Sequence, residues 1–328
     1  MTDDRKPTTV KTDWFPVRSS VVGTRSSNRG EGSIVSATRV TTVTLREMKD
    51  RGEKISMLTA YDYPIARLLD EVGVEVILVG DSLAMVGLGY ETTLPVTMDE
   101  MLHHVRAVSR GVKRALVVAD MPFGSFQVSA EEGVRNAARF LKEAGAHAVK
   151  LEGGREVKDL THRLTGIGIP VMGHLGLTPQ MVHQFGGFKV QARTAAAAER
   201  LVEEALLLEE AGIFSLVLEG IPWQVAEAIT EELRIPTIGI GAGSSCDGQV
   251  LVTNDLLGLF DDFTPKFVKR YASLKETITA AFAEYHGEVK AGQFPGREHA
   301  FRLDEGESRR WEQRLNRRRR TVKTLGRG

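Results

Sequence analysis

Short apolar runs rich in β-branched residues alternate with amphipathic stretches along the chain from Ile55 onward. Each run contains few polar residues, which is typical of strands that are buried on both faces of a parallel sheet. The expected strands are Ser56–Ala60, Val76–Val79, Leu116–Ala119, Ala148–Leu151, Val171–Gly173, Ser215–Leu218, Thr237–Ile240 and Val250–Thr253. Because helical patterns separate these eight runs, the sequence predicts an α/β fold, a closed (β/α)8 TIM barrel, rather than an open sheet.

Polar residues predict where the helices begin and end. Thr44 followed by Glu47 matches a capping box, so we expect a short N-terminal helix that caps the bottom of the barrel. Similar starts are expected at Thr97 and Ser129, and helix ends at Gly73, Gly145 and Gly212. Two connections depart from the ideal repeat: residues 241–249 are too few for a full helix, and residues 177–193 are long enough to form a lid or an additional wall of a site.

The two ends of the chain differ in composition from the middle. Residues 1–40 are rich in Ser, Thr, Arg and Gly, which predicts a flexible N-terminal arm ahead of a catalytic barrel over residues 41–295. Pro265 to Ala291 shows one long amphipathic helix pattern, and residues 296–328 form a basic tail that includes Arg317 to Arg320. Because no aromatic residues are interleaved with this basic run, we expect a solvated, mobile tail and no nucleic-acid partner.

Composition narrows the class of protein. The 328 residues include 43 Lys and Arg and 43 Asp and Glu, so the overall charge indicates neither nucleic acid nor a membrane surface as a partner. A single cysteine, Cys246, excludes an intramolecular disulfide framework and favours a cytoplasmic location. The sequence contains no apolar run of the roughly 18 residues that a membrane span needs, and no signal-peptide core. We expect an enzyme that acts on small molecules.

The predicted strand ends carry an unusual number of charged residues. In a β/α barrel these ends face the active site, so the residues there are the first candidates for chemistry. In strand order they are Tyr61 and Asp62, Asp81 and Ser82, Asp120, Lys150 and Glu152, His174, and Glu219. Carboxylates that converge on one buried mouth repel one another unless a positive charge lies between them. Oxygen ligands without a cysteine cluster favour Mg²⁺ or a similar ion over zinc.

The same positions indicate a reaction. Lys150 and Glu152 are two residues apart on one strand and therefore point to the same face, which suits a substrate with its own carboxylate. Glu219 lies on the sixth strand, across the barrel from the second and third, so it is the carboxylate best placed to accept a proton away from the metal. A metal-chelated 2-oxo acid next to a free base is a site for proton abstraction, with the metal stabilising the enolate.

Each of these residues also has a purely structural interpretation. Asp81 and Ser82 could form an ordinary turn, and any single carboxylate could be a helix cap or half of an ion pair. His174 could assist by hydrogen bonding or could serve only the packing at its strand end. Cys246 is expected to be inert, and the glycine-rich run at residues 239–243 is only a weak indication of a phosphate cradle.

Several longer motifs carry a more specific signal. They are TAYDYPIA at 59–66, VGDSLAMVGLGYETTLPVTMDEM at 79–101, ADMPFGSF at 119–126, VKLEGG at 149–154, GHLGLTPQ at 173–180, GIGAG at 239–243 and DGQVLV at 247–252. In these motifs the sequence closely resembles the ketopantoate hydroxymethyltransferase family, over residues 42–295. The resemblance implies a barrel of the phosphoenolpyruvate/pyruvate superfamily and an assembly of identical subunits, often a decamer.

The resemblance also implies an activity and residue roles. It implies one Mg²⁺ per subunit and hydroxymethyl transfer from 5,10-methylenetetrahydrofolate to 3-methyl-2-oxobutanoate, which gives 2-dehydropantoate on the way to pantothenate. By resemblance, Asp81 and Asp120 ligate the metal, and Glu152 joins them directly or through water. Ser82 and Lys150, together with the two aspartates, are expected to hold the oxo acid, and Glu219 to accept the proton from C3.

Two other functions remain open at the level of sequence. One is a related barrel enzyme that cleaves or rearranges a C–C or C–P bond of a 2-oxo acid at the same metal site, and a requirement for tetrahydrofolate would separate the two enzymes. The other is a catalytically silent barrel that acts as an assembly partner. Retention of every motif carboxylate argues against the silent barrel. No motif indicates where the folate would bind.

Overall fold

The computed structural model describes residues 38–260 and 265–325, and it contains a closed barrel of eight parallel strands in sequence order. The strands are β1 (Ile55–Thr59), β2 (Val76–Val79), β3 (Leu116–Asp120), β4 (Ala148–Glu152), β5 (Val171–Gly176), β6 (Ser215–Glu219), β7 (Thr237–Ile240) and β8 (Gly248–Leu251). The predicted TIM barrel is therefore confirmed. Of the charged residues expected at strand ends, all but Asp62 lie within two residues of the carboxyl end of a strand, and Asp62 lies three residues beyond the end of β1.

The barrel closes where β8 pairs with β1, with Ile55 opposite Gly248. Glycine is required at this position because a Cβ atom on Gly248 would lie 2.6 Å from the Ile55 carbonyl oxygen and 2.6 Å from the Ile238 side chain. This strand begins at Gly248 and ends at Leu251, so it is displaced toward the N-terminus relative to the predicted Val250–Thr253. The apolar pattern missed the beginning of β8 because the pairing there depends on a residue without a side chain.

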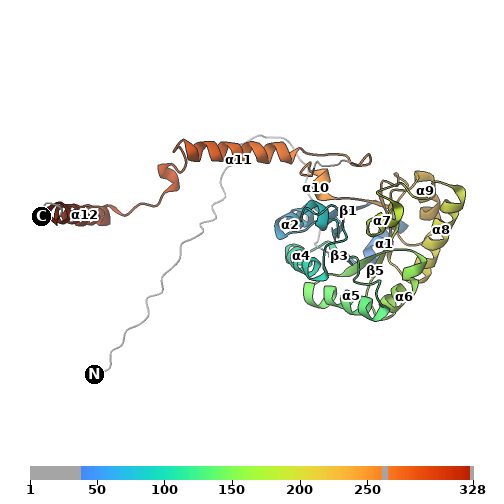
Figure 1. Cartoon of the computed structure of the whole chain (residues 1–328). Helices are drawn as coiled ribbons and strands as arrows, with labels where there is room; N and C mark the ends of the chain where they lie inside the picture. The colour runs from blue at the N-terminus through green and yellow to red at the C-terminus, as the bar shows by residue number, and fades with distance from the viewer. Residues whose placement is uncertain (1–37, 261–264, 326–328) are drawn as a thin grey trace, which may run out of the picture. The chain divides into compact units, whose positions relative to one another are not determined.

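Helices surround the strands, as Figure 1 shows for the labelled α2, α4, α5, α6, α8 and α9. The helices that follow strands β1 to β6 are α2 (Tyr63–Val72), α3 (Leu83–Val86), α4 (Met98–Gly111), α5 (Ala130–Ala144), α6 (Lys158–Gly166), α7 (Val182–Phe185), α8 (Ala195–Glu210) and α9 (Trp223–Glu232). Thr97 and Glu100 form the predicted capping box of α4, and Gly73 and Gly145 end α2 and α5 in the predicted left-handed conformation. Gly212 also has a positive φ, one residue beyond the C-cap of α8.

The N-terminal helix α1 (Thr42–Asp50) caps the barrel, as the sequence predicts. Its N-cap is Thr41 rather than Thr44, because Thr44 occupies the third helical position and returns the hydrogen bond to Thr41. Leu45 and Met48 of α1 are buried in one cluster with side chains from the strands, including Met57. This cluster fills the end of the barrel opposite the strand termini that carry the charged residues.

The segment after β8 differs from its prediction. Helix α10 (Thr253–Leu256) is short, and the long helix α11 begins at Leu274 and ends at Lys290 instead of beginning at Pro265. None of its residues is buried. The basic tail contains a 3₁₀ turn, η3 (Arg297–His299), and a helix, α12 (Glu305–Leu325), which the sequence pattern did not predict. The predicted N-terminal arm falls almost entirely on residues outside the described ranges.

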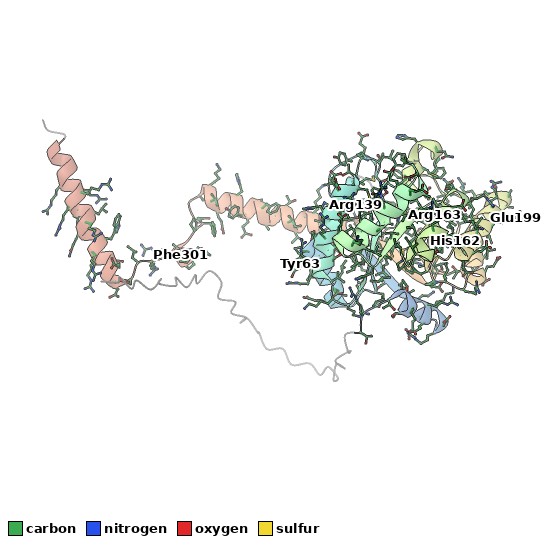
Figure 2. The ribbon with its side chains drawn as sticks, turned by 90° about the horizontal axis from the view of Figure 1, so that it is seen from below. Tyr63, Arg139, His162, Arg163, Glu199 and Phe301 are labelled. Carbon is green, nitrogen blue, oxygen red and sulfur yellow. The ribbon has the colours of Figure 1, made fainter. Side chains whose placement is uncertain are left out.

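The outer surface of the helix ring carries exposed ion pairs. Arg139 of α5 lies 2.8 Å from Asp99 of α4, and Arg163 of α6 lies 2.9 Å from Glu131 of α5. Figure 2 labels both arginines on this outer surface. Exposed pairs of this kind contribute little to stability. Among the described residues, no helix is both long and apolar enough to cross a membrane.

Candidate active site

Five charged residues from four neighbouring strands of the barrel meet at the carboxyl ends of the strands. They are Asp81, Asp120, Lys150, Glu152 and His174, and none is more than 4% exposed. Asp120 ends β3, Lys150 and Glu152 lie on β4, and His174 lies on β5 beside Glu152 in the sheet register. All except Asp81 also line a cavity of about 780 Å³ at the mouth of the barrel. The structure thus brings together the residues that the sequence predicts.

Lys150 provides the positive charge at the centre of this group. Its Nζ lies 2.6 Å from Oδ1 of Asp120 and 4.0 Å from Oε1 of Glu152. Burial alone would lower the pKa of Lys150, but Asp120, Glu152 and Asp81 raise it, so the ammonium stays charged. Burial raises the pKa of Asp120 even though the Lys150 charge opposes that shift. One ammonium therefore does not fully compensate the buried carboxylates.

Asp81 shows the remaining excess of negative charge most clearly. Burial raises its pKa well above the usual range, and the charges of Asp120 and Glu152 raise it further. Its backbone N–H donates to Oδ2 of Asp120 at 3.2 Å. The two aspartates are therefore neighbours, although they come from different strands of the barrel. Together they create a region of negative electrostatic potential.

Gln180 holds this arrangement in place, and sequence reasoning did not identify it. Its Nε2 donates to Oδ2 of Asp81 at 2.9 Å and to the carbonyl of Met121 at 2.9 Å. Its backbone N–H donates to Oε2 of Glu152 at 3.0 Å, and its own Oε1 accepts from Gln127 at 3.0 Å. Gln180 is the last residue of the GHLGLTPQ motif, and that motif was the only indication of its importance in the sequence. The contacts of Gln180 could not be predicted because they depend on how the loop after β5 folds back onto the barrel.

His174 lies between Glu152 and Glu219. Its Nδ1 is 3.3 Å from Oε1 of Glu152, and its Nε2 is 3.2 Å from Oε2 of Glu219. Burial and the Lys150 ammonium, whose Nζ is also 3.3 Å from Nδ1, lower the pKa of His174, but the two carboxylates outweigh them and raise it to about 9. The raised pKa favours an imidazolium, with a carboxylate oxygen within 3.3 Å of each ring nitrogen but no aligned hydrogen bond at Nε2. Of the two interpretations that the sequence left open, these contacts fit the polar one better than packing alone.

Glu219 stands apart from the buried group, as predicted for a proton acceptor. It ends β6, lines the cavity, and its side chain is 17% exposed. Its carbonyl accepts the Leu177 N–H at 2.8 Å. Because a Cβ atom on Gly176 would lie 2.2 Å from the Glu219 carbonyl oxygen, glycine is required there for this close approach of the β5 and β6 ends.

Of the residues at the ends of the first two strands, some line the cavity and others only stabilise the local structure. Ser82 lines the cavity, and its Oγ lies 2.9 Å from the hydroxyl of Tyr61. Asp62 is instead a helix cap, since its Oδ1 accepts the Ile65 N–H at the start of α2. The turn at Asp81 does form, because the Ala84 N–H donates to the Asp81 carbonyl, and the Asp81 side chain is at the same time buried beside Asp120.

The donor set fits a hard divalent cation by its chemistry. It consists of carboxylate oxygens, it carries more negative charge than Lys150 and His174 neutralise, and the buried Oδ1 of Asp120 has no aligned hydrogen-bond donor beyond the nearby ammonium. Within the described ranges, however, no three His, Cys, Asp or Glu side chains are gathered as a ready ligand shell. Gln180 and His174 engage both oxygens of Glu152, and Lys150 and the Asp81 N–H engage both oxygens of Asp120. On Asp81 only Oδ2 accepts a hydrogen bond from a described residue.

Comparison with known proteins identifies the family of this chain. A family model for ketopantoate hydroxymethyltransferase matches residues 39–297. A 3-methyl-2-oxobutanoate hydroxymethyltransferase of Syntrophus aciditrophicus is 65% identical over 263 residues, which cover 80% of this chain and 97% of that protein. One of Syntrophomonas wolfei is 56% identical over 267 residues, which cover 81% of this chain and 97% of the relative. The chain belongs to the ketopantoate hydroxymethyltransferase family. The family expected from the motifs is confirmed, and with it the expectation of an enzyme.

Solved structures agree on the fold. A phosphonopyruvate hydrolase in complex with oxalate and Mg²⁺ is 14% identical with a TM-score of 0.52, covering 86% of this chain and 98% of its own. A phosphoenolpyruvate phosphomutase of Streptomyces platensis is 15% identical with the same TM-score, covering 86% of this chain and 99% of its own. At this level of identity the likeness shows the fold alone.

The contacts of Gln180 lead to a stability prediction. Gln180→Leu keeps a similar volume but removes the amide donors to Asp81 and Met121, leaving buried acceptors without partners, so the free energy of unfolding should fall by about 1–3 kcal/mol. Urea unfolding at one fixed protein concentration measures this. Gln127→Leu removes the donor to Gln180 and an exposed acceptor of the Gly124 N–H, which water can replace, so it should cost less. Equal stability of Gln180→Leu and the unmodified protein would show that the hydrogen bonds of the Gln180 amide do not stabilise the fold.

Proposed function

We propose that the chain transfers a hydroxymethyl group from 5,10-methylenetetrahydrofolate to 3-methyl-2-oxobutanoate and so forms 2-dehydropantoate. The observation that carries the proposal is the separation of two charge systems: a buried Lys150 among Asp81, Asp120 and Glu152, and Glu219 held outside it at the same cavity. The first system suits a 2-oxo acid and a cation, and the second suits proton transfer. The names of the relatives support the same reaction.

The oxo acid is bound by the residues at the inner end of the cavity. Lys150 and Ser82 line this end and offer an ammonium and a hydroxyl to the substrate carboxylate. Asp81 and Asp120 would hold one Mg²⁺ per subunit, which when bound supplies Lewis-acid polarisation of the keto group and compensates the excess negative charge. Tyr61 holds the Ser82 hydroxyl in place through their 2.9 Å contact.

Glu219 takes the proton from C3 of the oxo acid. The His174 imidazolium next to it fixes the orientation of the carboxylate, and Glu152 on the other side of His174 fixes the ring. A C–C bond then forms between C3 and the one-carbon unit, and both bonds from that carbon to the folate nitrogens break. Water supplies the hydroxyl of the new CH₂OH group, and the proton from C3 and one from water complete the tetrahydrofolate that leaves.

The remaining features of the proposal concern assembly and location. We propose a homo-oligomer, of the decameric kind implied by the family, in the cytoplasm. Exposed apolar side chains on α11, where Phe282 is 69% exposed and Tyr285 57%, support contact with other copies of the chain. No specific observation favours the lyase or mutase alternative or the silent barrel.

The role of Glu219 has a direct test. Glu219→Gln keeps the size of the side chain but cannot accept a proton, so product formation should fall by about 10²-fold or more while the oxo acid still binds. Product formation and binding of 3-methyl-2-oxobutanoate are measured in parallel, with Glu91→Gln as a control on an exposed carboxylate. A variant that retains the wild-type rate would assign the base to another residue.

The metal role of Asp120 is tested separately. Asp120→Asn removes one charge from the proposed ligand set, so the dissociation constant for Mg²⁺ should rise by at least about tenfold. Isothermal titration of Mg²⁺ in the presence of the oxo acid measures it. Asp99→Asn, which removes a carboxylate on the outer surface, should bind Mg²⁺ normally. Unchanged affinity in Asp120→Asn would rule out the ligand assignment.

A further inference from the structure

The cavity is much larger than a five-carbon oxo acid requires. Even at roughly 30 Å³ for each heavy atom, the volume share of a water molecule, the acid would fill only about a third of a cavity of about 780 Å³. The buried charges occupy one end. The rest is lined mainly by apolar side chains, four of which are large and exposed: Phe188, Val190, Trp223 and Phe267. Exposed apolar groups around one cavity are typical of a site for a second, flat ligand.

Two glycines of the GIGAG run bring the aromatic side chains into this outer part. A Cβ atom on Gly241 would lie 2.7 Å from the ring of Phe267, and one on Gly243 would lie 2.5 Å from Cβ of Trp223. Both glycines also have a positive φ. The run after β7 therefore makes room for two aromatic residues at the mouth, which is a different role from the phosphate cradle that the sequence weakly indicated.

A second feature of this part of the cavity is the carboxylate of Asp255. Asp255 lies on α10 after β8, lines the cavity and is half-buried. Within the part of the chain that the structure describes, no residue donates a hydrogen bond to its carboxylate. Burial raises the pKa of Asp255 to about 6, against the opposing charge of Arg270, so the group is an anion at neutral pH. A half-buried carboxylate of this kind is stabilised by a ligand that brings donors.

Asp255 is also close to the oxo-acid end. It contributes, after burial and together with Asp81, to the raised pKa of Tyr61, and Tyr61 contacts Ser82. Lys266, by contrast, is an exposed cation that lines the cavity next to Phe267. From the interior outward, the cavity thus offers an anion near the reacting acid, aromatic walls, and an exposed cation.

This order matches the chemistry of a reduced folate. The pyrimidine edge of the pterin presents a ring N–H beside an amino group, two adjacent donors that one carboxylate accepts together. The flat ring stacks on aromatic side chains, and the glutamate tail is anionic. We propose that Asp255, Trp223 and Phe267 form the pterin subsite of the folate co-substrate, with the tail directed to Lys266. The inference rests on the proposed hydroxymethyl transfer and adds the residues that recognise its donor.

The test separates the pterin from the tail. Asp255→Asn replaces one acceptor by an amide that opposes the pterin donors, so the KM for 5,10-methylenetetrahydrofolate should rise by at least about tenfold, while the KM for the oxo acid changes less than about twofold. Isothermal titration with 6-methyltetrahydropterin should show the same loss of affinity. Titration of Asp255→Asn with p-aminobenzoylglutamate should show no loss of affinity, whereas Lys266→Ala should bind that probe more weakly.

A second variant tests the subsite independently, in case Asp255→Asn does not fold. Trp223→Ala should also raise the KM for the folate, and Trp311→Ala on α12 serves as its control because that tryptophan is equally exposed outside the cavity. The subsite is wrong if the wild type forms product and Asp255→Asn binds 6-methyltetrahydropterin as tightly as the wild type does. It is also wrong if Asp255→Asn loses affinity for p-aminobenzoylglutamate but keeps its affinity for 6-methyltetrahydropterin. If the wild type makes no product but binds the tetrahydropterin through Asp255, the proposed function fails and the subsite stands.

Discussion

The structure of the site depends on the compensation of buried charge around Lys150. Taking carboxylates out of water costs several kcal/mol for each ion unless opposite charges and hydrogen bonds replace the lost hydration. The Lys150 ammonium, 2.6 Å from Asp120, and the His174 imidazolium supply part of this compensation, and Gln180 supplies donors to Asp81 and Glu152. Burial raises the pKa of both Asp81 and Asp120, and the charges of Asp120 and Glu152 raise that of Asp81 further, so an additional positive charge would stabilise the ionised forms. A site in this state favours a cation.

The barrel places the buried charges and Glu219 at different positions around the same cavity. Parallel strands end at one rim, so β3 and β4 place their charges together while β6 places Glu219 on another part of the same cavity. His174 on β5 joins the two parts, because its imidazolium contacts Glu152 on one side and Glu219 on the other. One cavity can therefore hold an acid beside Lys150 and keep the proposed base, Glu219, outside the proposed metal site.

Sequence patterns predicted the parts of this arrangement that depend on order along the chain. The strands Val76–Val79 and Thr237–Ile240 were predicted at their observed bounds, and the charged strand ends converge as expected. What the patterns could not supply depends on three-dimensional register. Asp62 turned to cap its own helix, and Gln180 reached Asp81 only through the fold of the loop after β5. The start of α11 was missed because an exposed amphipathic pattern has no packing partner to mark its beginning.

The central claim is that this site removes a proton from C3 of a 2-oxo acid bound beside the buried charges. The most direct measurement is exchange of the C3 hydrogen of 3-methyl-2-oxobutanoate in deuterated water, followed by NMR with the wild-type protein. Exchange that requires Mg²⁺ is the expected result. Absence of metal-dependent exchange, with the acid shown to bind and with folate either present or absent, would contradict it.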